Sequence, residues 1–215
     1  MRIYVIRHGE TDANVRGILV GRTDWPLNEK GRALARITGR ALREVRFDRV
    51  FTSPLSRARE TAQILLAENA HPHVPTEVDA RLIEIAFGAW ECQGLGDDAV
   101  RLDRARFSTF FEAPFEFEPA PGGETVRAVC DRTADFLRAL LARKDLKDAV
   151  VLVSTHGCAT RALLNPLYDD PTDFWHGRVP DNCAVNVIEA DGSGARLVGE
   201  DRLFYDPVLA VNNYT

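Results

Sequence analysis

Residues 3–14 read IYVIRHGETDAN and contain the transition that decides the fold. The apolar run at 3–6 has the composition of a buried β-strand. It ends abruptly in the polar sequence RHGE at 7–10, which cannot continue such a strand. In α/β proteins, ligands bind just beyond the carboxyl ends of the strands. The stretch is therefore either a solvated surface loop or a site for an anion such as phosphate.

The length and composition are those of one soluble α/β domain. The chain has 215 residues, of which 45% are hydrophobic and 27% charged, and its formal net charge is −5. We expect a single domain over residues 1–215, with no nucleic acid or membrane as a partner, because both partners favour a basic surface. Apolar runs are too short for a signal peptide or a membrane span, and no two of the four cysteines form a CxxC pair. These features predict a cytoplasmic protein with reduced thiols.

Short apolar runs alternate with helical patterns along the chain. The expected strands lie at 3–6, 49–52 and 150–155. The expected helices lie at 29–45, 55–68 and 124–143 and directly after His156. Near the C-terminus, residues 184–203 predict two strands joined by a glycine-containing turn. Because the first three strands are continuously apolar, we expect helices on both of their faces. The sequence thus predicts a three-layer α/β sandwich with a mostly parallel central sheet.

Arginines and histidines follow each of the three apolar strands. Arg7 and His8 follow the first, Arg57 follows the second, and His156 follows the third. The carboxyl ends of parallel strands meet at one edge of a sheet, so we expect these side chains to lie close together. Such a cluster, without metal-ligand spacing, suits an oxyanion, and phosphoryl transfer fits best. Arginine can bind two phosphate oxygens at once, and a neutral histidine can attack phosphorus.

This chemistry also needs a carboxylic acid that protonates the leaving alkoxide. The residues alone leave four candidates open, which are Glu10, Glu60, Glu84 and Glu91. Because arginine and histidine supply the positive charge, we expect no metal and no cofactor. Cys158 beside His156 is an alternative nucleophile, but Arg161 follows it too soon for the phosphate loop of a cysteine phosphatase.

Six segments carry a resemblance to a known family. They are RHGETDAN (7–14), GRTDWPLNEKG (21–31), SPLSRARETA (53–62), RLIEIAFGAWE (81–91), PGGET (121–125) and STHG (154–157). In this order they resemble the signatures of the histidine phosphatase superfamily, the phosphoglycerate mutase-like family with an Arg-His-Gly motif. An Arg-His-Gly tripeptide alone is a weak signal, whereas the ordered set is specific and covers most of the chain.

The resemblance implies a role for each matched position. His8 would be the nucleophile that forms a phosphohistidine, and Glu84 would be the acid and later the base that activates water. The full catalytic set would be Arg7, His8, Arg57, Glu84 and His156. Additional hydrogen bonds to the bound group would come from Asn14, Gly21 and Gly157. The chain departs from the family pattern at Cys92 and Cys158, where the family favours glycine or a small residue, and this affects the rim of the pocket rather than its chemistry.

Residues at about 92–121 predict a lid-like insertion rich in phenylalanine and glutamate. The phenylalanines, which lie within 107–117, either line a pocket for an apolar or aromatic phosphomonoester or only pack the lid onto the domain. Cofactor-dependent phosphoglycerate mutases carry a longer and more basic insertion here, so the short insertion favours a phosphatase.

We therefore expect a metal-independent phosphatase that acts on small phosphorylated metabolites through a phosphohistidine. The first alternative is a cofactor-dependent phosphoglycerate mutase. The second is a non-catalytic module that binds phosphorylated ligands, which the complete catalytic set disfavours. The sequence leaves the physiological substrate and the oligomeric state open, and a homodimer is one option.

Overall fold

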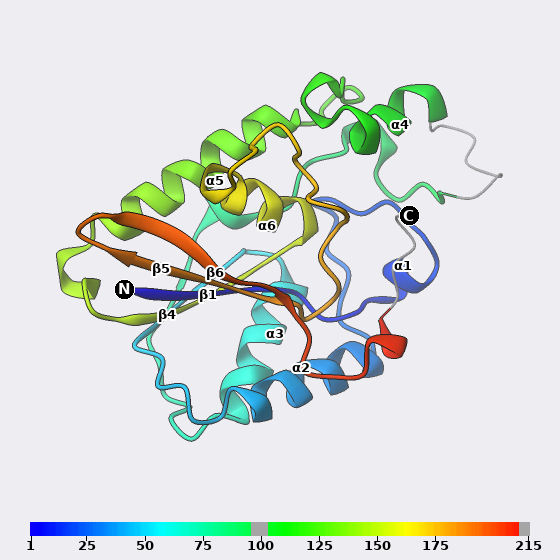
Figure 1. Ribbon diagram of the computed structural model, residues 1–215. Helices are drawn as coiled ribbons and strands as arrows, with labels where there is room; N and C mark the ends of the chain where they lie inside the picture. Colours follow the sequence, from blue (N-terminus) through cyan, green and yellow to red (C-terminus); the bar gives the residue numbers. More distant parts are fainter. Residues whose placement is uncertain (96–102, 211–215) are drawn as a thin grey trace.

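The computed structural model describes residues 1–95 and 103–210, which form a sheet with helices on both faces (Figure 1). The strands are β1 (Arg2–Arg7), β2 (Arg49–Thr52), β3 (Thr76–Val78), β4 (Val150–Thr155), β5 (Val185–Asp191) and β6 (Gly194–Arg202). They are ordered β3-β2-β4-β1-β5-β6 in the sheet. Strands β1 to β4 run parallel, whereas β5 is antiparallel to β1 and β6 to β5. The mostly parallel sheet and the C-terminal pair of strands are therefore as expected.

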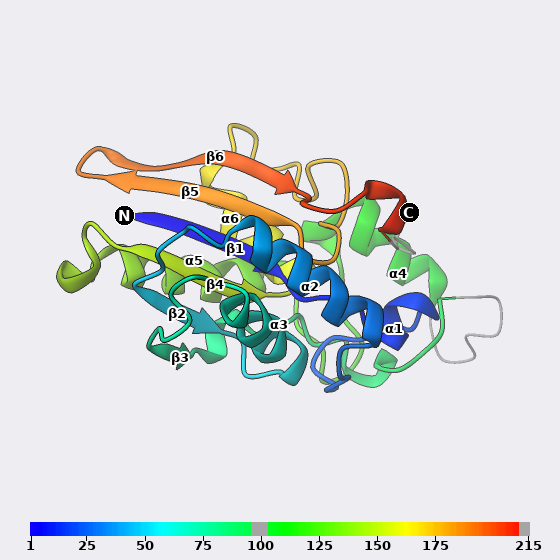
Figure 2. The ribbon, with the colours of Figure 1, turned by 90° about the horizontal axis from the view of Figure 1, so that it is seen from below.

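Helices cover both faces of this sheet. They are α1 (Asp12–Val15), α2 (Glu29–Ala41), α3 (Ser56–Ala67), α4 (Arg104–Glu112), α5 (Val126–Leu141) and α6 (Gly157–Leu164). Single 3-10 turns lie at Ala80–Leu82, Gly88–Trp90, Pro114–Glu116, Lys144–Leu146, Asn165–Leu167 and Pro207–Leu209. Figure 2 shows α2 and α3 on one face and α5 and α6 on the other. The three-layer prediction is confirmed. No helix in the described part of the chain is both long and apolar enough to cross a membrane.

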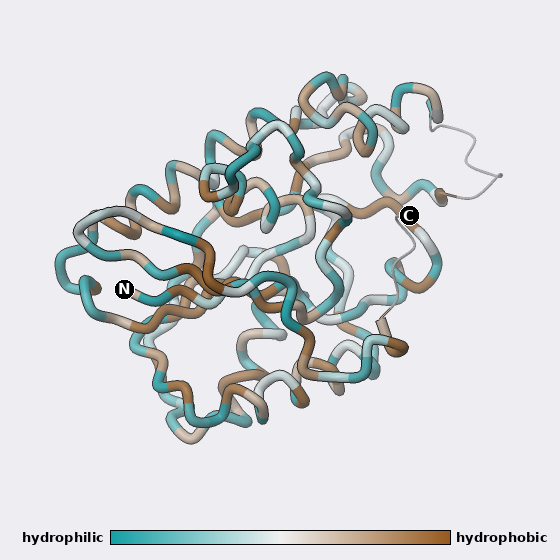
Figure 3. Tube along the Cα trace, in the orientation of Figure 1, coloured by the Kyte–Doolittle hydropathy of each residue, from teal (hydrophilic) through white to brown (hydrophobic). Residues whose placement is uncertain are grey.

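Hydrophobic side chains fill both spaces between the sheet and its helices. Val151 and Val153 of β4 pack with Phe136 and Leu140 of α5. Leu152, between them, belongs to the core on the opposite face, with α2 and α3. Neighbouring residues of a strand point to opposite faces, so a strand that is covered on both sides is apolar at successive positions and not at alternate ones. Figure 3 shows these hydrophobic stretches where the strands cross the centre of the molecule.

The carboxyl ends of three strands meet at one edge of the sheet. The last residue of β1, Arg7, lies opposite the last residue of β4, Thr155. The last residue of β2, Thr52, lies opposite Ser154 of β4. The residues that follow these strands, among them His8 and His156, therefore come together. This edge faces the side of the molecule that carries α1 and α4 (Figure 1).

Candidate active site

His8 and His156 lie next to each other at this edge, with ring centroids 5.2 Å apart and planes at 60°. The His8 Nδ1–H group donates to the carbonyl oxygen of Gly9 at 2.7 Å. Because a carbonyl oxygen can only accept, Nδ1 carries the proton and Nε2 keeps its lone pair. Burial, followed by the positive charges of Arg57 and Arg7, lowers the pKa of His8 well below its ordinary value. The ring is thus held neutral, with Nε2 as a nucleophile.

His156, the neighbour of His8, is fully buried. Its Nε2 lies 2.6 Å from the hydroxyl oxygen of Ser53. Burial, followed by the positive charge of Arg57, lowers the pKa of His156 as well. Its buried Nδ1 has no hydrogen-bond partner among the described residues. His156 itself is not among the residues that line the cavity, so the contact of this ring with a bound phosphate that the family resemblance implies stays a prediction.

Arg7 and Arg57 line the same cavity, each held by backbone carbonyl groups. Arg57, in the first turn of α3, donates from Nη2 to Gly21 at 2.7 Å and from Nη1 to Thr23 at 3.0 Å. Arg7 donates from Nη1 to the carbonyl oxygen of Pro180. These bonds fix the planes of both guanidinium groups. A fixed planar guanidinium can bind two oxygens of one phosphate, so the pair forms a cradle for an oxyanion.

Glu84 also lines the cavity, where three backbone N–H groups hold its carboxylate. Oε1 accepts from Ile85 at 2.9 Å and from Ala159 at 3.0 Å, and Oε2 accepts from Cys158 at 3.1 Å. Two of these donors belong to the first turn of α6. The N-terminus of a helix favours a negative charge, so this contact fixes the carboxylate beside the phosphate cradle.

The other three carboxylates that the sequence left open are engaged elsewhere. Glu91 accepts from Gly21, Arg22, Thr23 and Phe87. Burial raises its pKa, but the hydrogen bonds from Thr23 and the backbone outweigh this and hold its pKa below the ordinary value. Glu10 contacts Asn28 and Lys30, and Glu60 contacts Arg32. Of the four candidates, all in the described part of the chain, Glu84 alone lines the cavity.

The three expected substrate-binding residues differ in position. Asn14 and Gly157 line the cavity. Gly157 is packed so closely that a Cβ atom there would lie 2.7 Å from the Val179 side chain. Gly21 lies behind Arg57, since its carbonyl accepts from that side chain and its N–H group donates to Glu91 at 3.2 Å. A direct contact of Gly21 with a ligand would need these bonds to rearrange.

Apolar side chains form part of the cavity lining, and the cavity encloses about 490 Å³ including open solvent. They are Leu19, Val20, Phe87, Phe110, Trp175 and Val179. In the phenylalanine-rich segment 107–117, Phe110 lines the cavity. Phe107 and Phe117 do not line it and pack against Phe110. The Trp175 indole donates to the Phe110 carbonyl at 2.9 Å. No local sequence pattern marks Trp175, which comes from an irregular loop.

The remaining alternatives for the chemistry find no support in this geometry. Burial and the nearby Glu84 raise the pKa of the Cys158 thiol well above its ordinary value, so Cys158 stays protonated and is a poor nucleophile. Among the described residues, no group of three or more histidine, cysteine, aspartate or glutamate side chains is placed to hold a metal ion. The histidines outside the motifs, His71, His73 and His176, lie away from the cavity lining.

Comparisons with known proteins identify similar sequences and a similar structure. Residues 3–201 match the histidine phosphatase superfamily (branch 1). The adenosylcobalamin/alpha-ribazole phosphatase of Salmonella typhimurium is 32% identical over 207 residues, which cover 96% of this chain and 100% of that protein. The 2,3-bisphosphoglycerate-dependent phosphoglycerate mutase of Methylobacterium sp. is 32% identical over 164 residues, 75% of this chain and 78% of that one. The structure of Bacillus stearothermophilus YhfR has a TM-score of 0.84 at 32% identity, covering 94% of this chain and 97% of that one.

Proposed function

The chain belongs to branch 1 of the histidine phosphatase superfamily, and on that premise we propose that it is a metal-independent phosphomonoester hydrolase. The observation that carries this proposal is that His8, whose Nδ1 is engaged by the Gly9 carbonyl, lines one cavity with Arg7, Arg57 and Glu84. Together these groups supply a nucleophile, a cradle for the phosphoryl oxygens and a carboxylate for proton transfer.

The reaction follows from these roles in two steps. His8 Nε2 attacks phosphorus, the bond between phosphorus and the ester oxygen breaks, and Glu84, which must enter this step in its protonated form, donates its proton to the departing alkoxide. Water then attacks the phosphohistidine, Glu84 takes a proton from that water, and inorganic phosphate leaves. Arg7, Arg57 and His156 bind the phosphoryl oxygens throughout and stabilise the charge that spreads over them in each transition state.

The walls of the cavity favour hydrolysis over transfer between positions of phosphoglycerate. A mutase must hold a carboxylate and a second phosphate beside the phosphohistidine. Six of the fourteen described lining residues are aliphatic or aromatic, with Phe87, Phe110 and Trp175 prominent among them. Such walls suit an alcohol with an apolar or aromatic part. We propose that residues 92–121, of which 96–102 lie outside the described residues, form a lid that contributes to this choice through Phe110, within a single cytoplasmic domain.

The first experiment measures free phosphate and isomerised product together. The protein is incubated in excess chelator with p-nitrophenyl phosphate, alpha-ribazole phosphate and sugar phosphates, with and without 2,3-bisphosphoglycerate. We expect phosphate release without isomerisation, and no release by His8→Ala. Primer-dependent isomerisation of 3-phosphoglycerate with little free phosphate would instead establish a mutase, and loss of turnover in chelator would refute metal independence.

A further inference from the structure

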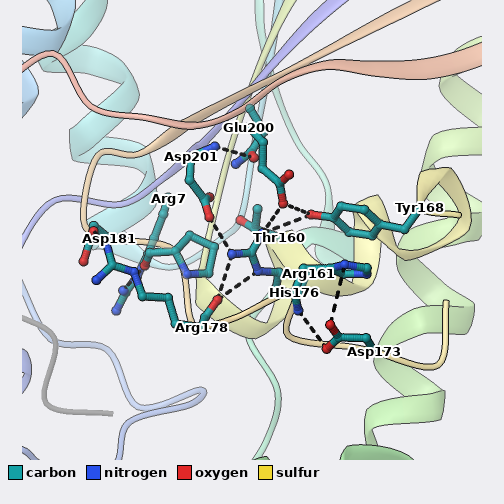
Figure 4. A network of polar contacts seen from close by, with 12 residues as sticks. Arg7, Thr160, Arg161, Tyr168, Asp173, His176, Arg178, Asp181, Glu200 and Asp201 are labelled. Atoms are coloured by element: carbon teal, nitrogen blue, oxygen red, sulfur yellow. Dashed lines mark hydrogen bonds and ion pairs between the residues drawn. The ribbon is translucent and has the colours of Figure 1, made fainter. Parts of the chain in front are cut away.

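The guanidinium group of Arg161 is fully buried on α6, outside the cavity (Figure 4). Its Nε and Nη2 donate to the carbonyl oxygen of Arg178 at 3.0 and 2.8 Å. Its Nη1 donates to the Tyr168 hydroxyl at 3.0 Å and to Glu200 at 3.1 Å, and its Nη2 donates to Asp201. A buried charge is costly unless it is paired and its donors are satisfied. Arg161 meets both conditions, so it fastens α6, β6 and Arg178 together.

The backbone of β6 is distorted in a way that serves this contact. Consecutive residues of a strand normally point to opposite faces, yet Glu200 and Asp201 both reach Arg161. The pairing of β5 with β6 shifts register here, and Asp201 has a φ of +41°. The Asp201 N–H group donates to the Asn186 side chain at 3.0 Å. A bulge thus turns two consecutive carboxylates toward one guanidinium, and such strain persists only where surrounding contacts enforce it.

Arg178 is the first residue of a segment that contacts the carboxyl end of β1. We name residues 178–183 the clamp loop. Its Pro180 carbonyl accepts from the Arg7 guanidinium. Its Asn182 side chain donates to the His8 carbonyl at 3.0 Å. The clamp loop therefore contacts both the phosphate-binding arginine and the nucleophile.

Two further contacts make the clamp loop part of the cavity. Val179 lines the cavity and packs on Gly157, where a Cβ atom would lie only 2.7 Å from its Cγ1. The Cys183 N–H group donates to the Arg7 carbonyl at 3.1 Å, and Cys183 has a φ of +59°. A displacement of the clamp loop would therefore move Arg7 and the wall above it together.

We propose that Arg161 is a positioning residue that sets the affinity of the cavity for a phosphoryl group by fixing the clamp loop. Two of its bonds end on one backbone carbonyl, that of Arg178, and the carbonyl two residues later orients Arg7. Small misplacements of a charged group weaken the binding of an oxyanion and of the transition state alike. The inference rests on the proposed function, because it assumes that the cavity binds phosphate.

Calorimetric binding of inorganic phosphate tests this proposal without requiring turnover. Lysine at position 161 keeps the charge beside Glu200 and Asp201 but cannot form the paired bonds to the Arg178 carbonyl. We expect Arg161→Lys to bind phosphate about tenfold more weakly, a change of about 1.4 kcal/mol. The matched control is Tyr168→Phe, which removes a bond from the same guanidinium but leaves the clamp loop untouched, and phosphate affinity should change less than about twofold.

A double-mutant cycle with Asn182→Ala separates positioning from a general loss of stability. If Arg161 acts through the clamp loop, the effects of Arg161→Lys and Asn182→Ala on phosphate affinity will not add. Unchanged phosphate affinity in a folded Arg161→Lys protein, or equal weakening by Tyr168→Phe, would overturn the proposal. If Arg161→Lys does not fold, Asp201→Asn should weaken phosphate binding about two- to threefold, and no change would overturn the proposal. A wild-type protein that binds phosphate without hydrolysing esters refutes the proposed function alone, whereas absence of phosphate binding refutes both.

Discussion

At the residue scale, Glu84 is the group whose role a single substitution tests most directly. Glutamine is similar in size and keeps an oxygen for the backbone N–H groups of Ile85 and Ala159, but it cannot donate and regain an acid proton. We expect kcat/KM of Glu84→Gln for alkyl phosphates to fall by about 10²- to 10³-fold, and that for p-nitrophenyl phosphate much less. Nitrophenolate leaves without a proton, and kcat/KM reports the steps up to release of the first product.

Glu91→Gln is the matched control for this measurement. Its carboxylate holds the backbone of residues 21–23 and does not line the cavity. We expect Glu91→Gln to lower kcat/KM by the same factor for both leaving groups, because the loss comes from displaced backbone. Equal losses in Glu84→Gln would show that Glu84 acts as a structural group and not as the acid.

At the scale of single elements, the turn after Gly88–Trp90 carries a strain that a substitution can remove. Cys92 has a φ of +63°, and its N–H group donates to Leu19 at 2.8 Å. A side chain in this left-handed conformation costs about 1 kcal/mol, which glycine avoids in part. We expect Cys92→Gly to raise the free energy of unfolding in urea by about 0.5–1 kcal/mol. Cys92→Ala keeps the strain and should bring no gain, so equal stabilisation by both variants would contradict this account.

Local pattern was sufficient for the elements that are buried on both faces and insufficient for those at the edges. β2 and β4 have the predicted bounds because each contains an uninterrupted apolar run, Val50–Phe51 and Val150–Val153. β3, with the sequence TEV, is a short edge strand with no hydrophobic pattern to detect. The sequence pattern did not predict α4, whose phenylalanines pack on aromatic rings from several segments, such as Phe87 and Trp175, rather than on the sheet. α2 ends at Ala41 rather than at 45. The residues that follow form hydrogen bonds between residues three apart, as in a tighter helical turn.

At the scale of the whole molecule, the topology explains which parts of the site could be foreseen. His8, Arg57 and His156 each follow a parallel strand, and parallel strands bring their ends together. Glu84 lies in an irregular segment between two 3-10 turns, so the residues alone could not select it and the family resemblance did. The clamp loop was not foreseen because it acts partly through backbone carbonyls, which any residue type supplies.

The two buried histidines also make the stability of the whole molecule depend on pH. The pKa values of His8 and His156 are lowered in the fold, whereas an unfolded histidine has a pKa of about 6.5. Below about pH 6.5 the two histidines therefore bind protons in the unfolded chain but not in the folded chain. The free energy of unfolding falls as the pH falls. We expect urea unfolding in phosphate-free buffer to show a slope of up to about 1.4 kcal/mol per pH unit for each histidine between about pH 6.5 and 5. His8→Gln and His156→Gln should each flatten this slope, while His71→Gln, at an exposed position, should leave it nearly unchanged. A slope that persists in the His8→Gln/His156→Gln double variant would assign the acid sensitivity to carboxylates instead.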